Sequence, residues 1–143
     1  MILVSACLAG IDCRYDGCNR RDEKVIEWLK DNIVIPVCPE QMGGLSTPRP
    51  AAEIDDGDGN DILNKTTIVI DSDGKDITEK IIKGAEEVLK LAKMTGVTIA
   101  YLKDRSPSCG RYHIYRKGKL IEGIGVLAAL LERNGIRVNG FKE

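Results

Sequence analysis

Short β-branched runs alternate with longer amphipathic stretches along this chain, and this alternation limits its possible folds more than any other feature. The strand-like runs are residues 2–5, 33–37, 66–70, 97–102 and 136–138. Two of them, 33–37 and 66–70, are continuous, as expected of strands that are buried on both faces. Strands that alternate with helices predict an α/β fold with one open, mainly parallel, Rossmann-like sheet and flanking helices.

The amphipathic stretches predict three helices, at residues 21–32, 76–96 and 123–133. In the second of these, Asp76 and Glu79 have the spacing of a capping box, and Gly96 is placed to end the helix. No internal repeat or domain boundary is visible in the 143 residues, so we expect a single domain over residues 1–143.

Charge and hydropathy exclude several classes of function. The formal net charge is −1, and with no basic tail we expect no unaided binding to nucleic acid. No apolar run approaches the ~18 residues that a membrane helix requires, so we expect no membrane association. The apolar start of the chain lacks the basic flank of a signal peptide, which predicts a cytoplasmic protein.

The chain has five cysteines: Cys7, Cys13, Cys18, Cys38 and Cys109. An odd number of cysteines in a cytoplasmic chain argues against a disulfide framework. Buried structural thiols, a metal or cluster site, or a nucleophile are then the possible roles. Cys7 directly follows the first predicted strand, Cys38 follows the second, and Cys109 lies a few residues beyond strand 97–102. Carboxyl ends of parallel strands share one sheet edge, where ligands of such folds bind, so these three thiols are expected to converge there.

The segments around these thiols are rich in proline and glycine. One is a long connection from Pro39 to Gly59, and the other is the Ser106–Gly110 turn. A long connection in a compact domain is usually functional. Structural zinc sites usually contain paired Cys-x-x-Cys knuckles, which this chain lacks, whereas cluster ligands need not be close in sequence. Three thiols therefore favour a 4Fe-4S cluster with one open iron, and a structural zinc domain is the alternative.

Three blocks of sequence resemble the signatures of the thiouracil desulfidase family. They are SACLAG followed by CRYDG, CPE followed by GGLSTPR, and SPSCG. The resemblance implies a 4Fe-4S cluster held by Cys7, Cys38 and Cys109, with the open iron binding a thiocarbonyl sulfur. It also implies Glu40 and Ser106 as catalytic residues, with Ser106 preferred to Ser108. We expect Cys13 to lie near the site without binding iron, and Cys18 to be incidental.

Five further residues are candidates for substrate binding: Arg14, Tyr15, Asp16, Arg49 and Ser108. Arg14, Tyr15 and Asp16 could bind a pyrimidine edge or a phosphate, or form a structural clamp. Arg49 lies in the long connection and is an anion-binding candidate. Lys103 and Arg105 could also meet a phosphate, although a solvated strand end is the simpler interpretation.

These assignments predict a non-redox enzyme that converts a thiolated pyrimidine, thiouracil or its nucleotide, to uracil and hydrosulfide. Iron would activate the C=S bond as a Lewis acid. Glu40 would act as general base on a water molecule, which Ser106 would orient. The alternative is a non-catalytic protein that carries the cluster as a sulfur carrier or accessory factor.

Overall fold

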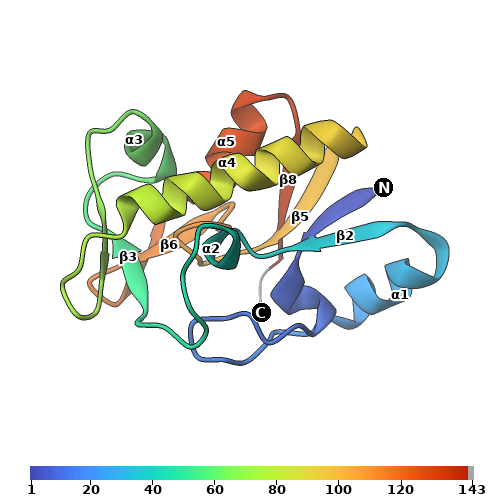
Figure 1. Ribbon diagram of the computed structural model, residues 1–143, viewed down its shortest axis with the longest axis horizontal. Helices are drawn as coiled ribbons and strands as arrows, with labels where there is room; N and C mark the ends of the chain where they lie inside the picture. Colours follow the sequence, from blue (N-terminus) through green and yellow to red (C-terminus); the bar gives the residue numbers. More distant parts are fainter. Residues whose placement is uncertain (142–143) are drawn as a thin grey trace.

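A four-stranded sheet forms the centre of the protein in the computed structural model, which describes residues 1–141. The strand order is β2-β1-β5-β8, and every neighbouring pair is parallel. These strands are β1 (Ile2–Ser5), β2 (Val34–Val37), β5 (Ile99–Lys103) and β8 (Arg137–Phe141). The predicted open, mainly parallel α/β sheet is confirmed (Figure 1).

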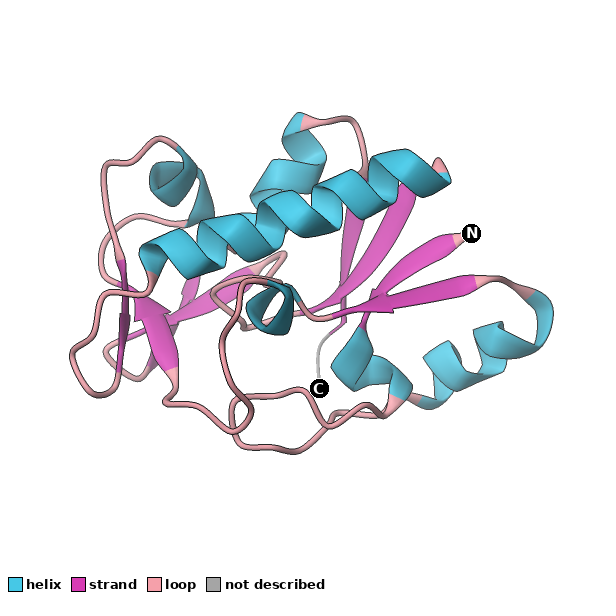
Figure 2. Ribbon diagram, in the orientation of Figure 1, coloured by secondary structure: helices cyan, strands magenta, loops and turns pink. Residues whose placement is uncertain are grey.

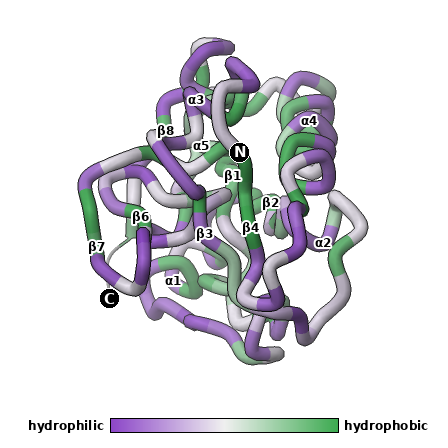
Figure 3. The backbone as a smooth tube through the Cα atoms, turned by 90° about the vertical axis from the view of Figure 1, so that its left-hand side faces the viewer, coloured by the Kyte–Doolittle hydropathy of each residue, from purple (hydrophilic) through white to green (hydrophobic). Residues whose placement is uncertain are grey.

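Helices cover both faces of this sheet (Figure 2). On one face, α4 (Thr78–Thr95) and α5 (Val126–Arg133) pack against Leu3, Ala100 and Leu102. On the other face, α1 (Glu23–Asp31) packs its Val25 and Trp28 against Val4 and Tyr101. Leu3 and Val4 point to opposite sides because side chains alternate along a strand. Figure 3 shows hydrophobic and hydrophilic residues alternating along α4, as its amphipathic pattern requires.

The helices begin later than the sequence predicted. Asp22 caps α1 by accepting a hydrogen bond from the Lys24 N–H. The predicted capping box of Asp76 with Glu79 is wrong, because α4 begins at Thr78 and has no side-chain cap at Ile77. Asp76 instead accepts hydrogen bonds from the N–H and the hydroxyl of Thr78, which ends the preceding turn. Gly96 follows α4 in a left-handed conformation, as predicted.

The run at 66–70 is not part of the central sheet, and this prediction is corrected. It contributes to β4 (Val69–Asp71), which pairs antiparallel with β3 (Ala52–Ile54) in a separate ribbon. A second antiparallel ribbon, which the sequence analysis missed, joins β6 (His113–Arg116) to β7 (Lys119–Glu122). Val69 is fully buried even so, because the ribbon packs against the core. The hydrophobic composition of the run at 66–70 therefore predicts burial, but it does not predict which strand pairs with β4.

Short helices occupy segments that were expected to be irregular. A 3₁₀ helix, η1 (Ala6–Ala9), directly follows β1, and α2 (Pro39–Met42) directly follows β2. The long connection from Pro39 to Gly59 also contains β3 and leads into α3 (Gly59–Leu63). No helix within residues 1–141 combines the length and the hydropathy that a membrane span requires.

Candidate active site

A cavity of about 450 Å³ lies at the carboxyl ends of β1, β2 and β5. Its size falls in the range that is usual for small-molecule sites. Four of the five cysteines line the cavity: Cys7, Cys13, Cys38 and Cys109. Glu40 and Ser106 also line it. The sheet edge that the sequence predicted as the functional one therefore collects thiols, a carboxylate and a hydroxyl in one place.

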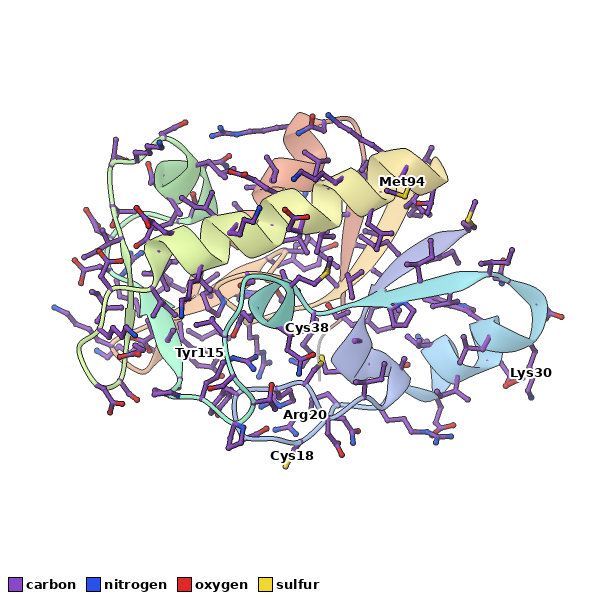
Figure 4. All side chains as sticks on the ribbon, in the orientation of Figure 1. Cys18, Arg20, Lys30, Cys38, Met94 and Tyr115 are labelled. Carbon is purple, nitrogen blue, oxygen red and sulfur yellow. The ribbon has the colours of Figure 1, made fainter. Side chains whose placement is uncertain are left out.

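Three of these thiols come from separate elements. Cys7 lies in η1, Cys38 immediately precedes α2, and Cys109 lies in the connection between β5 and β6. Cys7 and Cys109 are buried and Cys38 is partly buried. Cys18 is exposed, and Figure 4 shows it on an outer loop, pointing away from the protein, whereas Cys38 lies inside. The structure thus brings the three predicted ligands together and leaves Cys18 apart.

Cys13 is close to the predicted ligands, as the sequence analysis expected. It is only 2 % exposed, and the Cys38 thiol donates a hydrogen bond of 3.6 Å to its carbonyl oxygen. Its carbonyl oxygen accepts a hydrogen bond of 2.9 Å from Arg49 Nη2. The Cys38 thiol acts to lower the pKa of Cys13, but the Cys7 thiol and burial raise that pKa to about 11. In this chain, a fourth thiol therefore adjoins two of the three predicted ligands.

The thiols of Cys38 and Cys109 are also held in the neutral state. The hydrogen bond with Cys13, followed by burial, raises the pKa of Cys38. Burial raises the pKa of Cys109, which a hydrogen bond from Ser5 partly opposes. Thiols in such surroundings keep their protons unless a cation replaces them. This donor set fits a metal group that binds thiolates.

The thiols that line the cavity come from distant parts of the chain. A structural zinc site needs four donors around a single ion. A 4Fe-4S cluster spreads its thiolate ligands over several metal atoms and accepts ligands from distant parts of a chain.

Glu40 is fixed through both of its carboxylate oxygens. Arg49 Nε donates to Oε1 at 2.9 Å, and the Ser108 hydroxyl donates to Oε2 at 3.1 Å. The side chains of Arg49 and Glu40 are only 6 % and 16 % exposed, so the ion pair is largely shielded from water. Arg49 and Ser108 were predicted to bind substrate. The structure places both of them against Glu40, and Ser108 is not among the described residues that line the cavity.

Two glycines allow α2 to pack closely against α4, which places Glu40 of α2 at the cavity. A Cβ atom at Gly84 of α4 would lie 1.8 Å from the Pro39 carbonyl oxygen, and one at Gly43 would lie 2.0 Å from the Lys80 carbonyl oxygen. Real Cβ atoms never approach so closely, so the two helices can pack in this way only with glycine at both positions. Figure 1 shows α2 directly beside α4.

Ser106 has a fixed hydroxyl oxygen. The N–H groups of Ser108 and Cys109 each donate to Ser106 Oγ at 3.1 Å. The loop is also anchored by Asp104, whose Oδ1 accepts the N–H groups of Arg111, Tyr112 and His113. Burial acts to raise the pKa of Asp104, but the bonds from Tyr112 and His113 outweigh it and keep that pKa below its ordinary value. The sequence analysis missed this anchor, which holds the turn that carries Cys109.

Cationic and aromatic side chains also line the cavity. Arg14 and Tyr15 line it, as predicted, whereas Asp16 is not among the described lining residues and pairs with Arg14 at 3.4 Å. Lys103 and Arg105 also line the cavity, and Lys103 is only 7 % exposed, so the interpretation as a solvated strand end is wrong. Arg105 has a left-handed backbone (φ 73°), and its buried Nε has no hydrogen-bond partner. A strained backbone and an unpaired buried donor are typical of a binding residue.

Comparisons with known proteins are consistent with this site. The sequence profile of a family described as 2-thiouracil desulfurase matches residues 2–143. An uncharacterized protein of Bacillus subtilis (strain 168), YbbK, is 45% identical over 141 residues, which cover 96% of this chain and 93% of that protein. A solved structure, the 4Fe-4S-dependent thiouracil desulfidase TudS, has a TM-score of 0.85 and 38% identity, covering 97% of this chain and 89% of that one.

Proposed function

Because the chain belongs to the 2-thiouracil desulfurase family, we propose that it removes sulfur from a thiolated pyrimidine and releases uracil and hydrosulfide. The main structural support for this proposal is the cavity, in which three thiols lie near a carboxylate that is hydrogen-bonded through both of its oxygens. The structural neighbour TudS is named as a 4Fe-4S-dependent thiouracil desulfidase, which supports the same cofactor for this chain.

The three thiols that would hold the cluster are Cys7, Cys38 and Cys109. A 4Fe-4S cluster with three protein ligands supplies one open iron, a Lewis acid that can bind a thiocarbonyl sulfur and withdraw electrons from the C=S bond. This leaves Cys13 as a neighbour that lines the same cavity and accepts a hydrogen bond from the Cys38 thiol.

Glu40 and Ser106 provide the proton chemistry in this proposal. Glu40 takes a proton from a water molecule as the water oxygen attacks the carbon of the C=S bond. Ser106 lines the same cavity and orients that water, because its oxygen is already held by two backbone N–H groups. The proton that remains on the added oxygen passes to the sulfur as the C–S bond breaks, so the carbon keeps the oxygen as a carbonyl, the sulfur leaves as hydrosulfide, and Glu40 releases its proton to solvent. No electrons enter or leave the pair of reactants, so the reaction is non-redox.

Between the free base and its nucleotide, the cavity favours the nucleotide. A pyrimidine base occupies only part of 450 Å³, and the wall carries Arg14, Arg20 and Arg105. The unpaired Nε of Arg105 is a donor that a phosphate oxygen would satisfy. We also place Tyr15 beside the pyrimidine, because it lines the cavity next to Arg14.

We also propose a cytoplasmic location, since all five cysteines are free thiols, as a reducing compartment requires. The proposed partner is a small molecule. We propose no unaided binding to nucleic acid, because the formal net charge is −1.

The experiment that tests the function is anaerobic reconstitution with iron and sulfide, followed by incubation with thiouracil, thiouridine and thiouridine monophosphate. We expect sulfide release, with the monophosphate giving the highest kcat/KM. A cluster-replete protein that releases no sulfide from any of these compounds would instead identify a carrier or accessory protein. A colourless protein that retains zinc would overturn the cluster itself.

A further inference from the structure

Tyr115 is an aromatic residue of the cavity wall to which the mechanism above gives no role. It lies in β6, and it lines the same cavity as Cys38 and Glu40. Ile114, the residue before it, is 1 % exposed and belongs to the core. Because side chains alternate along a strand, Tyr115 points away from the core, and it is 38 % exposed. Figure 4 shows Tyr115 to the left of Cys38, on the side of the antiparallel ribbons.

The ring of Tyr115 has no partner within residues 1–141. Each of the other five aromatic rings of the chain has one: Trp28, Tyr101, Phe141, Tyr15 and Tyr112. The first three pack against one another, with ring centroids 4.5 Å to 5.6 Å apart, and the other two each lie against an arginine. Tyr115 makes no ring contact, cation–π contact or side-chain hydrogen bond in this part of the chain. Its aromatic face is therefore available to a ligand in the cavity.

The backbone is fixed on both sides of Tyr115. Before it, the N–H of His113 donates to Asp104 Oδ1 at 3.1 Å. After it, the N–H of Lys117 donates at 2.7 Å to Oε1 of Glu53, which lies in β3. The strand itself pairs with β7 along its whole length. A ligand that binds against this ring would therefore need to order little of the protein, which favours binding.

An available aromatic face suits a flat heterocyclic ring. Nucleobases stack on aromatic side chains because every base has a π face, and contact between the two faces removes both from water. Tyr15 also lines the cavity, but the guanidinium of Arg14 lies 5.4 Å from the centre of its ring. Of the two tyrosines in the wall, Tyr115 is thus the one whose ring is not already engaged by another side chain.

We infer that Tyr115 is a substrate-binding residue of this site, and that its ring stacks on the pyrimidine ring of the substrate. This inference rests on the proposed function, because it takes a thiolated pyrimidine as the occupant of the cavity. Stacking holds the base by its face, which leaves the C=S group at the edge of the base accessible to the thiol site and to Glu40. Tyr115 therefore selects a flat, conjugated ring over a saturated ring that carries the same thiocarbonyl group.

The test compares thiouracil with dihydrothiouracil, which keeps the thiocarbonyl group but has a saturated, puckered ring. Equilibrium dialysis gives Kd for each compound with the reconstituted protein, and sulfide release at matched cluster content gives kcat/KM. In Tyr115→Leu we expect the preference for thiouracil to fall by about tenfold in both quantities, as for the loss of one stacked base. Tyr115→Phe keeps the ring and should keep the wild-type preference. Leu120→Ala is the matched control, since it removes the exposed side chain opposite Tyr115 on β7, and it should change nothing.

Three outcomes would overturn the inference. One is an unchanged preference in Tyr115→Leu with verified iron content. Another is an equal loss in Tyr115→Phe, which would assign recognition to the hydroxyl. The third is an equal loss in Leu120→Ala, which would show that the packing of the ribbon decides the preference. Failure of the proposed function is distinguishable from all three, because wild type would then release sulfide from neither compound, while dialysis would still compare their binding.

Discussion

Replacing Glu40 by glutamine tests the catalytic proposal most directly, and the structure indicates how the variant should behave. Glutamine keeps the size of glutamate but cannot act as a base. Its amide oxygen can still accept from Arg49 Nε, and its amide nitrogen can donate to Ser108, whose hydroxyl is able to accept as well as donate. The side chain should therefore stay in place while the base is lost.

The expected loss of rate is large. Removal of a general base typically lowers the rate by ~10²–10⁴, which corresponds to about 3–5 kcal/mol of transition-state stabilisation. Stability should fall as well, since Arg49 is 6 % exposed and would lose its charged partner. Breaking a buried ion pair by removing one partner costs about 3–5 kcal/mol, or a fall in Tm of roughly 10 °C.

The assay follows sulfide release from thiouridine monophosphate at matched cluster content, at a temperature well below the Tm of the variant. Ser108→Ala is the matched control, because it removes one hydrogen bond to Glu40 but leaves the base in place. We expect a loss of about tenfold or less for Ser108→Ala. Wild-type turnover by Glu40→Gln with verified iron content would remove Glu40 from the mechanism and refute the reasoning.

Three more predictions concern the cluster, the substrate and pH. Alanine at any of the three proposed ligands should abolish stable incorporation of iron, whereas Cys13→Ala and Cys18→Ala should retain it. Analysis of bound iron and sulfide checks this, and loss of iron in Cys13→Ala would contradict the ligand assignment. Arg105→Ala should raise KM for the nucleotide by about tenfold and leave KM for the free base unchanged; equal effects on both would remove its phosphate contact. In the cluster-free protein, the raised pKa of Cys13 contributes about 3 kcal/mol of stability, which is complete below pH ~9 and is lost as pH rises through about 11. Urea unfolding over this range should show a steeper fall for wild type than for Cys13→Ala, and parallel curves would refute this contribution.

Much of the fold and the position of the site could be predicted because they depend on local patterns. Strands and helices alternate in the sequence, and this alternation with short connections nearly requires a parallel sheet. Cys38 directly follows β2, and Cys7 lies two residues after the end of β1, so their position at the carboxyl edge of the sheet did not depend on knowing the strand order. The family signatures then indicated the chemistry, and the roles of the individual residues stay predictions.

The remaining features depend on contacts between distant segments. The run at 66–70 has the composition of a central strand, but its partner is β3, and only tertiary packing decides which strands pair. Ser108 meets Glu40 across 68 positions, and Ser5 meets Lys103 across 98. The local sequence around each of these polar residues is equally compatible with a side chain that binds substrate or is hydrated at the surface. In the folded protein they bond to other residues instead, because a buried donor or acceptor needs a hydrogen-bond partner inside the protein. The arrangement of the sheet and helices determines which residue that partner is.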